Sequence, residues 1–203
     1  MRSSSLARLF HRRPRVAGDD GDRWPPLPPD LRLEGADIWL RWPCLSDADA
    51  VFAYAGVEEV SAFMDWRPHD SAEESRRFLH LLEQNRNWGR EAAFGIIERD
   101  SGELVGLCSL IAQRSLTVAE IGYALRLSAW GKGYMTDAVR LISDWAFRSL
   151  KLNEIFADVH PDNVASQRVL EKSGFRRQPT LVRRTIKGAD SQHYRYLLQS
   201  ERL

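Results

Sequence analysis

The pattern of apolar and polar positions predicts strands and helices that alternate around one sheet. Runs rich in apolar and β-branched residues predict a hairpin at 92–112 and strands at 37–42, 116–127, 154–160, 180–186 and 192–199. Apolar positions at helical spacing predict helices at 47–55, 72–88, 131–149 and 163–173. The resulting order, β-α-α-β-β-β-α-β-α-β-β, indicates a mixed α and β domain.

Polar residues and glycines mark the expected ends of these elements. Ser46 and Ser71 each precede a helical run with acidic residues in its first turn, as N-cap residues do. Gly56 and Gly174 follow helical runs and are expected to end them. The hairpin is expected to turn at 100–102, which reads Asp-Ser-Gly.

Length and composition favour one folded domain behind a different N-terminal segment. The 203 residues, 43% of them apolar, suffice to bury a core. Residues 1–30 carry arginines first, then a short acidic run, then a proline-rich stretch. We expect residues 1–30 to be a flexible Arg/Pro-rich extension, with an amphipathic targeting element as the alternative, and residues 31–203 to be the domain.

Charge and cysteine content exclude several classes of protein. The formal net charge of +1 gives no global field that would recruit nucleic acid or an anionic membrane. Cys44 and Cys108 share no spacing typical of a metal site or a disulfide framework. No apolar run approaches the roughly 20 residues of a spanning helix. The expectation is a soluble cytoplasmic protein without metal, nucleic-acid or membrane partners, as a monomer or homodimer.

The junction Gly131-Lys132-Gly133, between an apolar run and an amphipathic helix, predicts a phosphate site. Glycines permit unusual backbone conformations and close approach, and a helix N-terminus offers unpaired N–H groups and positive potential. A Walker loop is disfavoured because Gly133 stands where that loop has Ser or Thr. A dinucleotide fingerprint is disfavoured because Thr136 stands where it has its third glycine.

The chain resembles the GCN5-related N-acetyltransferases, in their branch of ribosomal-protein N-terminal acetyltransferases. The resemblance spans about residues 31–200 and is sharpest over 119–175, which includes "AEIGYALRLSAWGKGYMTDAVR" and "ADVHPDNVASQRVLEKSGF". It implies an α+β fold whose twisted, mostly antiparallel sheet splays between the fourth and fifth strands, with about four helices around it. In that family a bulge kinks one of the two splayed strands.

The resemblance also implies acetyl-CoA as cosubstrate. Its pantetheine arm would lie in the splay, against backbone groups of Leu125, Arg126 and Leu127, and Asn163 would contact it as well. Backbone amides would wrap the pyrophosphate along Trp130, Gly131, Lys132, Gly133, Tyr134 and Met135. Trp130 and Met135 depart from the general superfamily pattern, but a backbone role does not depend on side-chain identity. Asn163 reads equally as a helix N-cap.

Acetyl transfer to an amine requires proton transfers, so we sought a base and a proton donor. Glu120, before "IGYAL" on the predicted splayed strand, is the candidate base, against the alternative of an exposed or ion-paired glutamate. Ser166 is the candidate proton donor to the departing thiolate, and Tyr194 is a less favoured one. Together they predict direct transfer without a covalent enzyme intermediate.

Acceptor recognition is expected from the segment "MDWRPHD" and the last hairpin, which border the acceptor groove in the family. Trp66, Arg67 and His69 would line it, although Trp66 and Phe63 could instead pack the first two helices. The favoured acceptor is the N-terminal α-amine of a protein such as a ribosomal protein. The alternatives are a small amine, such as an antibiotic, polyamine or amino acid, and a non-catalytic acyl-CoA-binding module.

Overall fold

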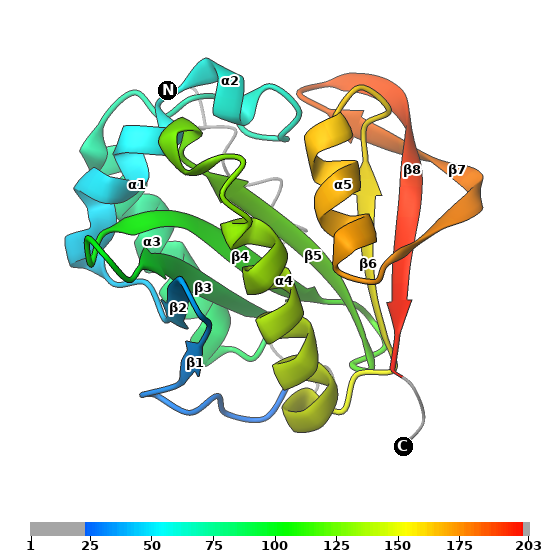
Figure 1. Cartoon of the computed structure of the whole chain (residues 1–203), viewed down its shortest axis with the longest axis horizontal. Coiled ribbons are helices and arrows are strands. Elements are labelled where there is room, and N and C mark those ends of the chain that lie inside the picture. Colours follow the sequence, from blue (N-terminus) through cyan, green and yellow to red (C-terminus); the bar gives the residue numbers. More distant parts are fainter. Residues whose placement is uncertain (1–22, 201–203) are drawn as a thin grey trace.

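A computed structural model describes residues 23–200 and contains one eight-stranded sheet (Figure 1). Its spatial order is β1-β2-β3-β4-β5-β6-β8-β7, and every neighbouring pair is antiparallel except β5 and β6. The strands are β1 (Arg32–Glu34), β2 (Ile38–Arg41), β3 (Glu91–Glu98), β4 (Leu104–Ala112), β5 (Val118–Leu125), β6 (Glu154–Val159), β7 (Arg176–Ile186) and β8 (Ala189–Gln199). The expected α+β fold with a mostly antiparallel sheet is therefore confirmed.

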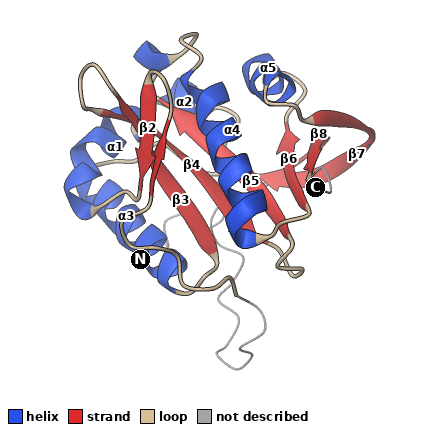
Figure 2. Cartoon of the chain, turned by 60° about the horizontal axis from the view of Figure 1, so that its bottom comes forward, coloured by secondary structure: helices blue, strands red, loops and turns tan. Residues whose placement is uncertain are grey.

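Helices cover both faces of the sheet (Figure 2). They are α1 (Ala48–Ala55), α2 (Glu58–Ser61), α3 (Ala72–Asn87), α4 (Tyr134–Trp145) and α5 (Val164–Lys172). One apolar cluster joins α1 and α3 to the sheet through residues such as Val51, Leu79 and Ile97. The other joins α4 and α5 to the opposite face through residues such as Ile142 and Leu170. The sheet is thus the middle layer of three.

Helix α3 begins where its capping residues predict. Ser71 Oγ accepts a hydrogen bond from the Glu74 backbone N–H at 3.3 Å, and the Glu74 carboxylate accepts one from the Asp70 N–H. Helix α1 differs from the prediction, because Ser46 lies in a 3₁₀ turn and Asp47 holds the N-cap position. The Asp47 carboxylate instead accepts two hydrogen bonds from the Arg41 guanidinium, each 2.7 Å long.

The amphipathic helix predicted at 131–149 is shorter in the structure. Gly133, with a φ of +87°, is its N-cap, and a residue in this left-handed region cannot belong to a right-handed helix. Helix α4 therefore begins at Tyr134, and after Trp145 the chain continues as a π-helical turn over residues 146–150. The two glycines lie in the loop that precedes the helix.

Three features were not predicted. Strand β1 and the one-turn helix α2 are too short to show a periodic apolar pattern. The last hairpin is longer than expected, since β7 and β8 meet at the two-residue turn Lys187-Gly188. Both turn residues have positive φ, +50° and +88°, which matches the right-handed twist of the strands.

Part of the segment expected to be an extension packs into the domain. Trp24 is only 2% exposed, belongs to the core cluster of α4, and donates its indole N–H to the Leu116 carbonyl at 3.0 Å. The Trp42 indole N–H donates to the Pro28 carbonyl at 2.8 Å. The expectation of a flexible extension up to residue 30 is thus wrong from Trp24 onward, and residues 1–22 lie outside the described residues.

The two central strands separate as the resemblance implies. Parallel pairing between β5 and β6 covers only Val118 with Glu154, Ala119 with Ile155, and Glu120 with Phe156. Beyond Glu120 the strands diverge, while β5 keeps an unbroken register with β4 up to Leu125. The expected bulge is therefore absent from the described β4–β5 pairing. Residues 121–125 of β5 have an edge that no strand of the described sheet pairs with.

Within residues 23–200, no helix is both long enough and apolar enough to cross a lipid bilayer.

A buried carboxyl group lies between α3 and the sheet, away from the splay. Glu91 is 1% exposed and accepts a hydrogen bond of 2.9 Å from the Asn85 amide. Burial raises the pKa of Glu91 from 4.5 to about 7, and hydrogen bonds from Asn85 and Ser109 oppose the rise. The folded protein consequently holds a proton there that the unfolded chain releases above pH 4.5.

We predict that Glu91→Gln makes the protein more stable at pH 8 than the wild type, by on the order of 2–3 kcal/mol. The raised pKa stabilises the fold fully below pH 4.5, and this contribution is lost as the pH rises through about 7. Urea unfolding at pH 5 and pH 8 measures the difference, which should nearly vanish at pH 5. Glu83→Gln, at an exposed carboxylate of α3, is the control. A loss of stability at both pH values would contradict the prediction.

Candidate active site

A cleft of about 650 Å³ occupies the splay between β5 and β6. Its walls come from the diverging strands, the loop before α4, the N-terminal part of α5 and the last hairpin. Residues 58–65, here called the α2 segment, complete them. Of the residues expected to bind the cosubstrate or react, those that line it are Glu120, Leu125, Trp130, Gly131, Gly133, Tyr134, Met135, Asn163 and Ser166. The splay thus brings together residues that are up to 46 positions apart (166 minus 120).

The loop before α4 has the geometry of an anion site. Gly131 and Gly133 have φ values of +76° and +87°, a region that non-glycine residues rarely adopt. A Cβ added at either glycine would meet no described atom within 4 Å, so the loop faces open space. The first N–H groups of α4 have no partner within the helix and point along the positive end of its dipole. These features suit a pyrophosphate.

Glu98, at the end of β3, anchors this loop. Its carboxylate accepts hydrogen bonds from Lys132 Nζ at 3.0 Å and from the Tyr134 hydroxyl at 2.9 Å. Hydrogen bonds from Ser101, Lys132 and Tyr134 lower the pKa of Glu98 to about 2. Lys132 therefore has a carboxylate partner and is not among the residues that line the cleft. We therefore expect Lys132 to stabilise the conformation of the loop through its ion pair with Glu98.

The backbone groups after β5 only partly match the expectation. The Arg126 N–H donates to the Val105 carbonyl, and the Trp130 N–H donates to the Leu127 carbonyl. Neither Arg126 nor Leu127 lines the cleft, because the Arg126 N–H is taken up by β4 and the carbonyls of both residues are taken up within a 3₁₀ turn. Leu125 does line it, and its carbonyl accepts a 2.7 Å hydrogen bond from the Trp130 indole. Trp130 thus supports the strand end with its side chain.

Asn163 and Ser166 open helix α5 at the cleft wall. The Asn163 side-chain oxygen accepts a hydrogen bond from the Ser166 backbone N–H at 3.1 Å, so Asn163 is the N-cap of α5. Ser166 Oγ lies 2.8 Å from the Tyr123 hydroxyl of β5. Sequence reasoning missed Tyr123, whose pKa is raised by burial. This contact between the two hydroxyl groups links β5 to α5 across the splay.

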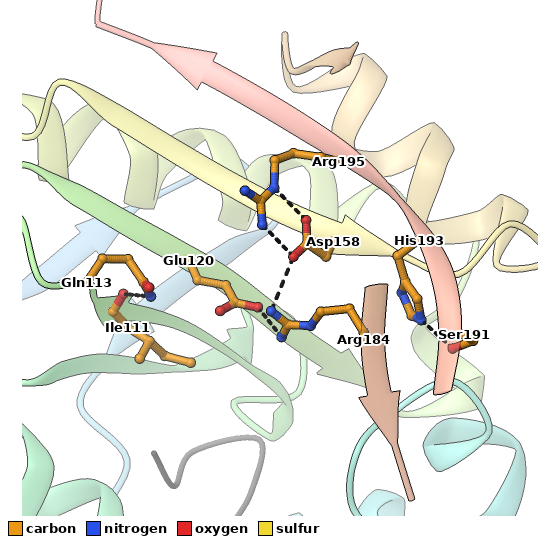
Figure 3. A network of polar contacts seen from close by, with 8 residues as sticks. All are labelled: Ile111, Gln113, Glu120, Asp158, Arg184, Ser191, His193 and Arg195. Carbon is orange, nitrogen blue, oxygen red and sulfur yellow. Dashed lines mark hydrogen bonds and ion pairs between the residues drawn. The ribbon is translucent and has the colours of Figure 1, made fainter. Parts of the chain in front are cut away.

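Glu120 takes part in an ion-pair network on the walls of the cleft (Figure 3). Arg184 of β7 contacts the Glu120 carboxylate at 2.6 Å and the Asp158 carboxylate at 3.2 Å. Arg195 of β8 donates two hydrogen bonds of 2.8 Å to Asp158, whose side chain is completely buried. The alternative noted for Glu120, an ion-paired glutamate, is thus present in the structure.

Tyr194, the less favoured proton donor, is not among the cleft-lining residues. It lies on β8 between His193 and Arg195, and the Arg177 guanidinium lies 3.2 Å above its ring centre. Because side chains alternate along a strand, His193 faces the cleft instead. Burial and the charges of His160 and Arg184 lower the pKa of His193.

The residues expected to recognise the acceptor lie elsewhere. Trp66 and His69 are each 5% exposed, and Trp66 belongs to the core beneath α1 and α3. His69 Nδ1 lies 2.7 Å from Ser75 Oγ, which explains why its polar ring is tolerated there. Arg67 is exposed and does not line the cleft. Large rings in a connecting segment are as suited to filling gaps between helices as to contacting a ligand.

Another part of the cleft lies between the α2 segment and the last hairpin. The contributors from the α2 segment are Glu59, Val60, Phe63, Met64 and Asp65, and those from the hairpin are Arg184, Ile186 and His193. Phe63 stacks on His160 with a centroid distance of 5.4 Å, and Lys187 Nζ donates to the Ser61 carbonyl at 2.9 Å. Phe63, for which the sequence offered packing between the first two helices, is exposed and lies on this wall of the cleft instead.

Comparisons with known proteins agree with the geometry. The family model described as an acetyltransferase (GNAT) domain matches residues 37–176. The probable N-acetyltransferase YjcK of Bacillus subtilis is 40% identical over 161 residues, which cover 76% of this chain and 88% of that protein. The family match covers most of the sheet and the whole of the loop before α4.

Two solved structures are similar in fold. RimJ of Mycobacterium smegmatis, in complex with CoA-disulfide, superimposes with a TM-score of 0.72 at 27% identity, covering 82% of this chain and 83% of that one. The ribosomal-protein-S5-alanine acetyltransferase of Vibrio fischeri has a TM-score of 0.74 at 23% identity, with coverage of 85% and 98%. The first of them carries a coenzyme A derivative.

We predict that Gly133→Asp weakens coenzyme A binding by at least about tenfold, because a carboxylate beside the phosphates is repelled. Gly133→Asn is the matched control, since it imposes the same positive φ and nearly the same shape without the charge. Isothermal titration calorimetry of the two folded variants compares their affinities. Equal affinities for coenzyme A would show that the phosphates bind elsewhere.

Proposed function

The chain belongs to the GNAT family of acetyltransferases and is an acetyl-CoA-dependent N-acetyltransferase, and from this premise we propose that its acceptor is the N-terminal α-amine of a protein, such as a ribosomal protein. The observation that carries the proposal is the single cleft that is lined both by the loop before α4 and by the α2 segment with the last hairpin, which we take as its acceptor end. That end is bordered by chain segments on two sides, as an extended peptide terminus requires.

The similar structures share the fold that the proposal requires. RimJ of Mycobacterium smegmatis, at 27% identity, and the ribosomal-protein-S5-alanine acetyltransferase of Vibrio fischeri, at 23% identity, each superimpose over more than four-fifths of the present chain. The lining of the acceptor end combines the carboxylates Glu59 and Asp65 with apolar Phe63, Met64 and Ile186. This mixture suits a protonated α-amine on an N-terminal residue whose side chain is short and apolar.

The cosubstrate is proposed to bind along the free edge of β5, with its pyrophosphate on the glycine loop. Leu125, Gly131, Gly133 and the first turn of α4 would hold it, and Asn163 would contact the pantetheine from α5. Arg168 and Lys172 of α5, which sequence reasoning missed, also line the cleft and add positive charge to it. Acetyl-CoA supplies a thioester, whose carbon bonds to the amine nitrogen as the carbon–sulfur bond breaks.

The remaining chemistry is proton transfer by the protein. Glu120 takes a proton from the acceptor amine, directly or through one water, and its side chain is 20% exposed to the cleft. Ser166, hydrogen-bonded to Tyr123, gives a proton to the sulfur that leaves. The half-buried Tyr123 keeps its own proton, because burial raises its pKa, and so it orients the serine by a hydrogen bond while the serine regains a proton from water.

We predict that the protein acetylates the α-amine of short peptides that begin with Ala or Ser. Mass spectrometry after incubation with acetyl-CoA would show one added acetyl group, and fragmentation would place it on the N-terminus. Peptides with a blocked N-terminus and a free lysine are the matched control, and polyamines test the small-amine alternative. Acetylation of polyamines alone would contradict the proposed acceptor, and binding of acetyl-CoA without any turnover would contradict catalysis.

We predict that Glu120→Gln lowers kcat/KM by roughly 10²–10⁴-fold, the usual range for general acid–base catalysis, with unchanged coenzyme A affinity. A weakly basic amine, already neutral at the assay pH, should be affected less than a strongly basic one. Steady-state kinetics with both acceptors and calorimetry with coenzyme A test this. Near-wild-type kcat/KM with both acceptors would mean that Glu120 is structural, and Ser166→Ala would then be measured next.

A further inference from the structure

Arg184 is the cationic side chain that the last hairpin presents to the acceptor end of the cleft. It lies on β7, the edge strand of the sheet, yet its guanidinium contacts Glu120 of β5 and Asp158 of β6. Its neighbour Arg183 points to the other face, where its side chain is 77% exposed and pairs with Asp190. Of these two adjacent arginines only Arg184 lines the cleft.

Neutralising Asp158 does not account for Arg184. The carboxylate of Asp158 is already held by Arg195 through two hydrogen bonds of 2.8 Å, and Arg195 does not line the cleft. The contact of Arg184 with Asp158 is longer, at 3.2 Å, and its side chain remains 31% exposed. A guanidinium has five N–H donors in a fixed plane, so Arg184 can hold Glu120 and still donate to a ligand.

The spacing of Glu120 and Arg184 matches a particular chemical unit. Glu120 Oε1 and Arg184 Nη2 lie 2.6 Å apart on the cleft wall, which places an acceptor of hydrogen bonds directly beside a donor. In an N-terminal residue the amine nitrogen and the carbonyl oxygen are roughly 3 Å apart, as standard backbone dimensions require. The amine donates and the carbonyl accepts, so the two pairs are complementary.

We infer that Arg184 is a specificity residue that donates a hydrogen bond to the carbonyl oxygen next to the acceptor amine, while Glu120 accepts from the amine. This inference rests on the proposed function and deepens it. It restricts the acceptors to α-amino carbonyl compounds, which are peptide N-termini and amino acid amides or carboxylates. Polyamines and the ε-amine of lysine have no carbonyl on the carbon that bears the amine and would lose this contact.

The test compares two acceptors, alaninamide and isopropylamine, the second of which has a methyl group in place of the carboxamide of alaninamide. Each variant is expressed relative to the wild type for each acceptor. A loss caused only by disturbing Glu120 should be larger for isopropylamine, the more basic amine, so a larger loss with alaninamide is specific to the carbonyl contact. For Arg184→Met, the loss in kcat/KM with alaninamide should exceed the loss with isopropylamine by about 10- to 100-fold, as expected for a charge-assisted hydrogen bond. Arg184→Lys should show an intermediate ratio.

Arg183→Met is the matched control, since it removes the same charge from the adjacent residue on the opposite face. It should leave the ratio of the two acceptors at the wild-type value. Thermal unfolding and coenzyme A affinity, measured for every variant, show that the fold and the cosubstrate site persist. If Arg184→Met loses the fold, Arg184→Lys gives the ratio instead.

Two results separate the inference from the proposed function. Equal losses with both acceptors would overturn the inference, because Arg184 would then act only by holding Glu120. If the wild type acetylated neither these amines nor Ala-initiated peptides, the proposed function would fall. In that case, calorimetry would measure the affinity of an Ala-initiated peptide for the protein with coenzyme A bound. Unchanged peptide affinity in Arg184→Met would overturn the inference about Arg184.

Discussion

The separation of β5 from β6 is the constraint on which the site depends. Three residue pairs hold the strands together up to Glu120 and Phe156. Beyond them, none of the strands within residues 23–200 pairs with β5 on that side. Buried or semi-buried backbone groups need hydrogen-bond partners, so an open edge inside a domain requires either water or a ligand. The cleft is therefore built into the sheet itself.

Other parts of the molecule keep this opening in shape. Glu98 fixes the loop before α4 through Lys132 and Tyr134, and Trp130 supports the end of β5. On the far side, β6 is paired with β8 along its whole length, so the outer wall is held by the last hairpin. The pocket needs no motion of the strands to accept an extended ligand, because both walls are supported from outside.

The charged side chains around Glu120 balance one another. Glu120 and Asp158 are matched by Arg184 and Arg195, so this network carries no net charge although two carboxylates and two guanidiniums lie within it. An ion pair lowers the availability of a carboxylate to other partners, and it also holds the carboxylate in one position. The arrangement favours orientation of an acceptor over simple attraction of a cation.

The sequence by itself determined most of the element order, the cap of α3 and the glycine loop, because these depend on neighbours in the chain. Periodicity, capping residues and positive-φ glycines act within a few residues, as Ser71 and Gly133 show. Its signals could not locate β1 or α2, which are too short for a period. Only the tertiary structure decided that Trp24 is core, that Trp66 and His69 are packing residues, and that Arg184 meets Glu120. Those outcomes depend on which side chains meet in the folded protein. Glu120 and Arg184 are 64 positions apart, so no local sequence pattern indicates their contact.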